Sequence, residues 1–194
     1  MPQKMSFLFN SAQGLKLAAN YLLDHMEDEG FKRNPVKYSF ILTAAATLES
    51  TLNDGIVSWA YNTFPRDDYK RHASAFLAIN LRGKLDVIGF LISKSTHITD
   101  NSSQTYQDLS NLVKLRNEVA HSKDFFTEVD IEMVTDEEGN EGFLLPPEFE
   151  RKFTNSPLIP SNEEYLKTYK SLELLYNVLN NEANYIDVDL FKAV

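Results

Sequence analysis

The sequence predicts a mainly α-helical protein, an antiparallel helical bundle with one inserted acidic β-hairpin. Several stretches carry apolar residues close to every 3.6 positions, the period of an α-helix. One stretch near residue 130 instead alternates apolar and acidic residues, as a strand does. No low-complexity linker divides the 194 residues, and this length suits one core. We therefore expect residues 1–194 to form a single domain.

Two helices are predicted in the first third of the chain. The first covers residues 11–29, where Ser11 can cap the start and Gly30 can end the helix. The second begins at Asn34 and Pro35, a polar cap followed by proline, and ends near residue 62. We expect the first helix to bury Leu15, Leu17, Ala18, Tyr21, Leu22 and Met26, and the second to bury Phe40, Ala44, Leu48, Leu52, Ile56 and Trp59.

The same helical spacing predicts further helices at about residues 67–79, 81–95, 104–121 and 162–184. The pattern changes at residues 126–134, where Val129, Ile131 and Met133 alternate with acids, as expected for a half-buried strand. A turn at residues 136–140 and a return strand at 142–145 would complete a β-hairpin over about residues 126–145.

Composition limits where the protein acts. The chain has no cysteine, which excludes disulfides, cysteine zinc sites and thiol nucleophiles. Its first apolar cluster, residues 7–9, is too short for a signal peptide, and no stretch has the roughly 20 apolar residues that cross a bilayer. We therefore expect a cytoplasmic protein with no membrane partner.

The negative charge is concentrated in one segment. The formal net charge is −9, yet residues 127–142 contain seven acids and neither Lys nor Arg. A neutral or basic face elsewhere is therefore compatible with the acidic total. The acidic hairpin could repel nucleic acid or bind a basic partner, such as a neutralising protein. Alternatively, its charges only keep an exposed strand edge from aggregating, and we give this second interpretation the larger weight.

The strongest functional signal is the segment Leu-Val-Lys-Leu-Arg-Asn-Glu-Val-Ala-His-Ser at residues 112–122. Arg116 is followed directly by Asn117, and His121 comes four residues later, at the end of an amphipathic helix. This pattern resembles the signature of the HEPN superfamily, in which an Arg and a polar residue precede a His. An Arg and a His five positions apart are a weak signal alone, and the longer phrase is more specific.

Two upstream segments strengthen the resemblance. Residues 47–53, which include Glu49 and Asn53, look like the Glu-containing segment of one HEPN branch. Residues 84–88 resemble the short Lys-Leu helix that stands before the Arg-Asn helix. The resemblance covers about residues 35–123, with the helix at 162–184 as a further bundle member. Glu49 could orient Arg116 or His121 or could be an ordinary surface residue, and Asn53 on the same face is most often structural.

The resemblance implies RNA cleavage without a metal or other cofactor. The Arg116 guanidinium can bind two phosphate oxygens, while His121 can exchange a proton near neutral pH. Asn117 can orient either group by hydrogen bonding. These groups suffice for attack by a ribose 2′-hydroxyl, and Lys114 and Lys123 are weaker candidates for RNA contacts. The four histidines show no metal-ligand spacing.

Helix geometry adds a constraint on this site. Arg116 and His121 are five residues apart, which places them roughly 140° apart around an ideal helix. Convergence on one phosphate needs a loosened helix, a curled Arg116 side chain or a second copy of the chain. HEPN domains are typically dimers that unite two such motifs, so we expect a homodimer.

Other interpretations remain open at this point. The resemblance implies an RNase in a toxin or defence setting, with an antitoxin or other regulatory protein as a candidate partner. The alternative is a non-catalytic HEPN module that binds nucleotides or proteins. A third reading is structural, with Arg116 and His121 capping the helix and Arg116 paired to Glu118 or Asp108.

Overall fold

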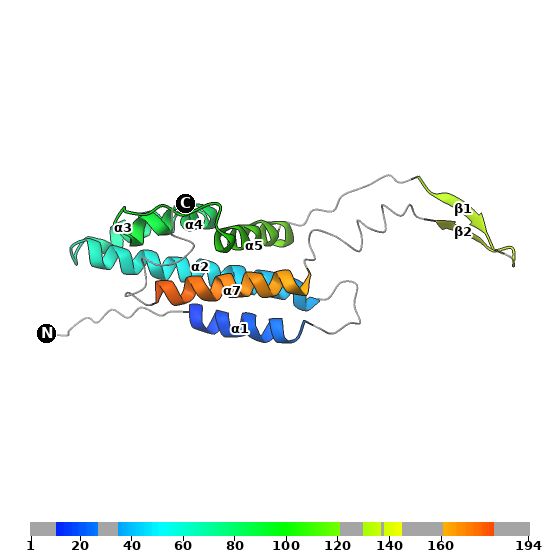
Figure 1. The fold of residues 1–194 in the computed structure, drawn as a ribbon, viewed down its shortest axis with the longest axis horizontal. Helices are drawn as coiled ribbons and strands as arrows, with labels where there is room; N and C mark the ends of the chain where they lie inside the picture. Colours follow the sequence, from blue (N-terminus) through cyan, green and yellow to red (C-terminus); the bar gives the residue numbers. More distant parts are fainter. Residues whose placement is uncertain (1–10, 27–34, 121–129, 137, 145–160, 181–194) are drawn as a thin grey trace.

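The computed structural model describes residues 11–26, 35–120, 130–136, 138–144 and 161–180, and this part of the chain is mainly helical. Four helices lie side by side along one axis (Figure 1). Their colours show that α1 and α5 run in one direction and α2 and α7 in the other. The four are α1 (Ala12–Asp24), α2 (Pro35–Thr63), α5 (Gln104–Ala120) and α7 (Asn162–Leu179).

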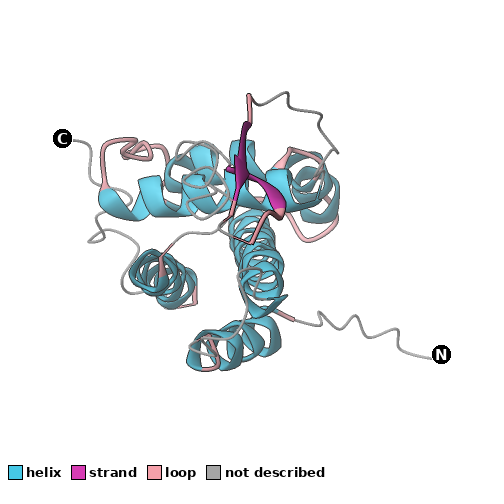
Figure 2. Cartoon of the chain, turned by 90° about the vertical axis from the view of Figure 1, so that its right-hand side faces the viewer, coloured by secondary structure: helices cyan, strands magenta, loops and turns pink. Residues whose placement is uncertain are grey.

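The longest helix, α2, lies at the centre of the described fold. It contacts α1, α5 and α7, and two shorter helices, α3 (Tyr69–Leu77) and α4 (Leu81–Ile92), pack on it as well. Viewed from one end, the helices surround α2, with the two strands in front of them (Figure 2). None of the described helices combines the length and apolar character needed to cross a membrane.

The predicted apolar stripe of α2 is confirmed. Five of its six members are fully buried: Phe40, Ala44, Leu48, Leu52 and Ile56. The sixth, Trp59, is partly buried, and its ring meets that of Phe76 on α3 edge to face at 4.9 Å. Helical spacing alone therefore identified the face that forms the core.

Gly55 explains how closely two helices approach α2. A side chain carbon at this position would lie 3.2 Å from Cδ1 of Leu179 on α7 and 3.3 Å from Cδ1 of Ile88 on α4. A glycine within a helix costs about 1 kcal/mol relative to alanine. Here the missing side chain leaves room for Leu179 and Ile88 in the core, which offsets part of that cost.

Two helices have clear N-terminal caps. The Ser161 hydroxyl accepts a hydrogen bond from the backbone N–H of Glu164, whose carboxylate accepts one from the Ser161 backbone N–H, 2.7 Å away. This capping box fixes the start of α7 and lowers the pKa of the Glu164 carboxyl through the hydrogen bonds from Ser161. Asn80 caps α4 by accepting from the N–H of Gly83 at 2.8 Å.

Helix α1 departs from its prediction. Ser11 stands at the cap position but makes no capping hydrogen bond, and its hydroxyl lies 3.1 Å from that of Ser50 on α2. The helix ends at Asp24, and Gly30 lies outside the described residues. Leu17 and Tyr21 were expected in the core, but they are 63% and 62% exposed. Ala18, expected there too, is also exposed, and the buried residues of α1 are instead Ala12 and Ala19. The prediction for Met26, which follows the helix, is confirmed because this residue is buried.

The two strands form an antiparallel pair at one end of the molecule. β1 (Glu132–Thr135) pairs with β2 (Glu141–Leu144), and Met133 lies opposite Phe143. Figure 1 shows the pair beyond the end of the bundle, apart from the labelled helices. The expected half-burial is therefore wrong, because none of the described helices covers Met133, which is 62% exposed. The first part of the predicted strand, residues 126–129, lies outside the described residues.

One oxygen of a partly buried carboxyl group on α2 has no hydrogen-bond partner among the described residues. The Oδ2 atom of Asp54 is shielded from solvent, and burial raises the pKa of this carboxyl from 3.8 to about 6. The unfolded chain would release this proton near pH 4. Between these two pH values the folded state retains a proton that the unfolded state has lost, so the contribution of Asp54 to stability falls as pH rises.

We predict that Asp54→Asn stabilises the protein at pH 7.5, by about 1 kcal/mol, because it removes a buried charge. The gain should fade as pH drops towards 4, where the wild-type carboxyl is neutral in the folded state. Thermal unfolding followed by circular dichroism at both pH values measures this difference. The matched control is Asp67→Asn at an exposed position, which should change stability little at either pH. An Asp54→Asn variant less stable than wild type at pH 7.5 would contradict the prediction.

Candidate functional site

Two of the predicted catalytic residues lie in the final turns of α5. Leu109, Leu112 and Val113 are buried and hold this helix on the bundle. Arg116 is partly buried, Asn117 is exposed, and an Arg116 guanidinium nitrogen donates to Asn117 Oδ1 at 3.0 Å. The structure therefore brings Arg116 and Asn117 together through their side chains. His121 and Lys123 follow the last described residue of α5 and lie outside the described part.

The charge of Arg116 is not neutralised within the described part of the chain. No carboxylate there forms an ion pair with its guanidinium. Asp108, one of the two partners considered for a structural ion pair, instead accepts hydrogen bonds from Gln104 at 2.7 Å and Ser171 at 2.8 Å. Because Arg carries five N–H donors, Arg116 keeps most of them for an anion. Lys114, two residues earlier, is exposed.

Glu49 and Lys84 form an ion pair between α2 and α4. The Lys84 ammonium lies 3.2 Å from Glu49 Oε1, with the lysine side chain 4% exposed and the glutamate side chain 42% exposed. The two upstream segments that carry the sequence resemblance therefore meet in space. The partner that the structure gives Glu49 is thus Lys84, and the pair fixes α4 against α2.

Asn53 lies one turn beyond Glu49 on the same face of α2. Its side-chain oxygen is shielded from solvent and has no hydrogen-bond partner among the described residues. A buried amide oxygen without a partner costs roughly 1–3 kcal/mol, so its presence calls for a reason. Asn53 thus remains a candidate supporting residue beside the Glu49–Lys84 pair.

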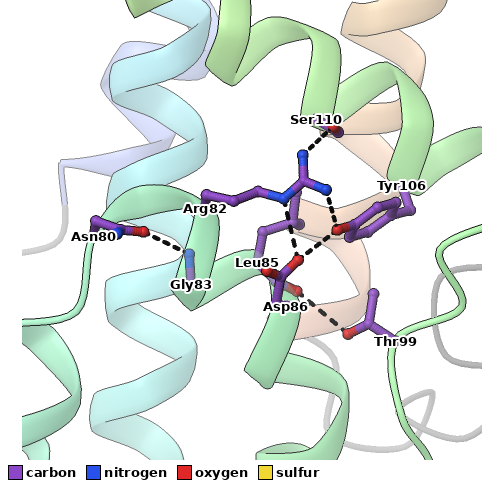
Figure 3. Close-up of polar contacts among 8 residues, drawn as sticks. All are labelled: Asn80, Arg82, Gly83, Leu85, Asp86, Thr99, Tyr106 and Ser110. Atoms are coloured by element: carbon purple, nitrogen blue, oxygen red, sulfur yellow. Dashed lines mark hydrogen bonds and ion pairs between the residues drawn. The ribbon is translucent and has the colours of Figure 1, made fainter.

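A second polar network joins α4 to α5 (Figure 3). Arg82 donates to the hydroxyls of Ser110 and Tyr106, and its Nε lies 3.3 Å from an Asp86 carboxylate oxygen. The Tyr106 hydroxyl in turn donates to Asp86. Burial, followed by the hydrogen bond and charge of Asp86, raises the pKa of Tyr106. The sequence analysis did not identify this network, although Arg82 and Asp86 stand four residues apart on one helix.

The Glu49–Lys84 pair and the Arg82 network distinguish cations that have an acidic partner from Arg116. Arg82 is hydrogen-bonded to Ser110 and Tyr106 and ion-paired with Asp86, and Lys84 is paired with Glu49. Both have structural partners that compete with any ligand. Among the described residues, the side-chain partner of Arg116 is the neutral Asn117. Among these three cations, Arg116 is therefore the one best able to bind a phosphate.

A cleft of about 230 Å³ lies between α2, α5 and α7. Pockets for small-molecule ligands usually measure about 300–1,000 Å³, so this cleft is small. The hydroxyl of Tyr165, which lines it, is buried without a partner among the described residues, and burial raises its pKa. On α5 the lining reaches Leu115 but does not include Arg116. We therefore do not place the functional site in this cleft.

No group of three or more His, Asp or Glu side chains in the described part of the chain is arranged to hold a metal ion. Comparison with known proteins finds no match among family models, curated proteins or solved structures. The candidate site accordingly rests on the residues of this chain and on the resemblance of residues 112–122 to the HEPN signature.

We predict that Glu49→Ala destabilises the protein by about 1–2 kcal/mol, because it leaves the buried Lys84 charge without its partner. Lys84→Met keeps most of the side-chain volume and should cost less than Glu49→Ala. Chemical denaturation of both single variants and the double variant measures the coupling.

The matched control for this pair is Glu173→Ala, which removes the partner of Lys16 on the other side of the bundle. The Lys16 side chain is 17% exposed, against 4% for Lys84, so the loss should be smaller. Equal losses for Glu49→Ala alone and in the Lys84→Met background would show that the ion pair does not stabilise the fold.

Proposed function

We propose that this protein is a metal-independent endoribonuclease of the HEPN type, with Arg116, Asn117 and His121 as its catalytic residues. The observation that carries the proposal is that the Arg116 charge has no carboxylate partner among the described residues. The guanidinium is oriented by Asn117 in the helix that leads to His121. A permanent positive charge left free of structural ion pairs suits a phosphodiester substrate.

The proposed reaction cleaves RNA by intramolecular attack. His121 accepts the proton of a ribose 2′-hydroxyl, and the oxygen forms a bond to the adjacent phosphorus. The bond from phosphorus to the 5′ oxygen breaks, and that oxygen takes up a proton from the protonated His121 or from water. In either case the neutral imidazole is restored once His121 has released its proton. The products are a 2′,3′-cyclic phosphate and a 5′-hydroxyl. Arg116 stabilises the negative charge that builds up on the phosphate oxygens, and Asn117 orients the guanidinium.

Residues around the site have supporting roles in this proposal. The exposed Lys114, together with Lys123, contacts the RNA backbone. The Glu49–Lys84 pair and Asn53 hold α2 and α4 in place beside α5 and act as positioning residues. The negative net charge of −9 is compatible with local RNA binding at α5, because seven of the acids belong to residues 127–142.

The proposal includes a homodimer in which each copy contributes to a shared site. Arg116 and His121 stand roughly 140° apart on an ideal helix. A second copy supplies the missing group without distortion of the helix. The cellular setting that we propose is a cytoplasmic toxin or defence system with a regulatory partner protein.

The second candidate is a non-catalytic HEPN module that binds a nucleotide or a protein. The overall acidity, with a sequence pI of about 4.9, favours this alternative over a general RNA-binding enzyme. It would use the same free guanidinium of Arg116 to hold an anionic group and would need no proton transfer by His121.

We predict that the wild-type protein cleaves a pool of structured RNAs in the presence of EDTA and leaves cyclic phosphate ends. His121→Ala and Arg116→Ala should each lower the cleavage rate by about 100-fold or more, because each removes a group that acts in the transition state. Gel electrophoresis of end-labelled RNA measures the rates.

The matched control is Arg71→Ala, which removes one positive charge at an exposed position on α3. It should cleave at nearly the wild-type rate. The wild type could instead leave RNA intact but bind an RNA oligonucleotide that the Arg116→Ala variant does not bind. That result would favour the non-catalytic binding module over the enzyme. Cleavage retained by both site variants would assign the activity to another site or to a contaminant.

The shared site can be tested by complementation. Arg116→Ala and His121→Ala chains are each expected to be inactive, yet after mixing and exchange a mixed dimer contains one complete pair. Roughly a quarter of the wild-type activity should return if half of the dimers are mixed and one of their two sites is intact. Light scattering after size exclusion should show a dimer, and a monomer with no complementation would refute the shared site.

A further inference from the structure

The β-hairpin presents apolar side chains that no other described part of the chain covers. Met133 on β1 lies directly opposite Phe143 on β2, and Ile131, just before β1, is two residues from Met133 and so falls on the same side of an extended chain. Their side chains are 49%, 62% and 59% exposed. Side chains of directly opposed residues in an antiparallel pair are close neighbours, so these three form one continuous patch. A half-buried strand was expected here, but the two strands stand beyond the end of the labelled helices (Figure 1).

The opposite face of β1 carries one acid, Glu132, together with Val134 and, across the pair, Leu144. Asp130 and Asp136 lie just beyond the two ends of β1, and Glu141 lies opposite Thr135 on the same face as Phe143. Residues 127–142 contain no Lys or Arg. The hairpin is therefore negatively charged overall, with Met133 and Phe143 on one face and Glu132 on the other.

The turn that joins the strands is already ordered. The Asp136 carboxylate accepts hydrogen bonds from the backbone N–H groups of Glu138 at 3.0 Å and Asn140 at 2.8 Å, and from the Asn140 side chain at 3.0 Å. Gly139 adopts a φ of +83°, which favours glycine. These hydrogen bonds, that of the Asn140 side chain first, lower the pKa of Asp136 and keep it charged. A partner would therefore meet a preformed strand rather than a flexible loop.

The outer edge of β1 is free to pair. β1 and β2 form a sheet of two strands in the described part of the chain, so each has one unpaired edge. The Asp136 N–H donates to the Asn140 carbonyl. Because backbone groups alternate in direction along a strand, those of Met133 and Thr135 point to the outer edge of β1. An isolated pair of strands is marginally stable in water, so a third strand would stabilise it.

We propose that the outer edge of β1 binds an extended, basic segment of a partner protein, which adds as a third strand. The alternation of β1 specifies the partner's sequence: apolar side chains would extend the patch around Met133, and Lys or Arg would lie over Glu132. The stems of long basic side chains would also cover Leu144, which lies opposite Glu132 and is 55% exposed.

Charge selects this occupant over the others. A second hairpin of the same chain would bring two sets of acids together, which is unfavourable. RNA and anionic membranes carry the same sign of charge as the hairpin and would be repelled. A basic protein segment is the partner whose charge and alternation both match. This interaction does not depend on RNA cleavage by Arg116 and His121.

The test uses the full-length protein and a synthetic peptide of alternating lysine and valine. Isothermal titration calorimetry should show binding that weakens as salt is added, and amide NMR shifts should map to residues 132–135. Replacing alternate valines of the peptide by proline should abolish binding, because proline cannot supply the strand hydrogen bonds. Equal binding of the proline peptide would show that only charge is recognised and would overturn the proposal.

Two hairpin variants separate the apolar face from the acidic one. Met133→Ser combined with Phe143→Ser keeps all charges and should weaken binding roughly tenfold or more. Glu132→Lys keeps the apolar face and should weaken binding to a similar extent. The matched control is Ile98→Ser, which changes an exposed apolar residue outside the hairpin, 64% exposed, and should bind as wild type does.

These variants also decide between occupants. Wild-type binding by Glu132→Lys would overturn the proposal even if the serine variant had lost its hairpin structure. Self-association of the wild type that disappears in the serine variant would identify a second copy as the occupant and would equally overturn it.

Discussion

The buried stripe of α2 is the constraint on which the remaining structure depends. Phe40, Leu48 and Ile56 have no exposed surface, and every other described helix packs against α2. Burial of a large apolar side chain contributes about 1.5–3 kcal/mol, so this one helix organises most of the apolar contribution to stability. The position of α5 follows from it, because Leu109 and Leu112 are buried in the same core. Arg116 is therefore presented by a helix whose inner face is fixed.

The same packing determines which charges have structural partners. Where α4 lies against α2 and α5, its cations are held: Lys84 by Glu49 and Arg82 by Asp86 and two hydroxyls. Arg116 lies near the end of α5, beyond these contacts, with Asn117 as its partner. A helix that is anchored in its middle and carries an unneutralised cation near its end is a suitable arrangement for binding an anion.

The sequence predicted the strongly periodic elements well and the exposed ones poorly. The α2 stripe was found because one face was apolar throughout, whereas Leu17 and Tyr21 misled because α1 is apolar on more than one side. The alternation of apolar and acidic residues around Met133 indicates that the strand has two different faces, but it does not show what packs against each face. The exposure of Met133 among the described helices was therefore not predictable from the sequence. The hydrogen bond from Arg116 to Asn117 joins neighbouring residues of the sequence motif. The hydrogen bond from Arg82 to Tyr106 joins residues 24 positions apart, so only the tertiary structure reveals it. His121 lies outside the described residues, so its role stays a prediction.

The contact of α7 with α2 at Gly55 has a consequence during protein synthesis. Leu179 fills the space that Gly55 leaves, yet α7 begins roughly a hundred residues after α2 ends, and such distant contacts form late. On the ribosome, part of the apolar surface of α2 would thus wait uncovered until α7 has emerged from the exit tunnel. The helices would therefore close only after α7 has been translated and has left the tunnel, and during this interval the exposed stripe of α2 is the surface most open to non-native contacts.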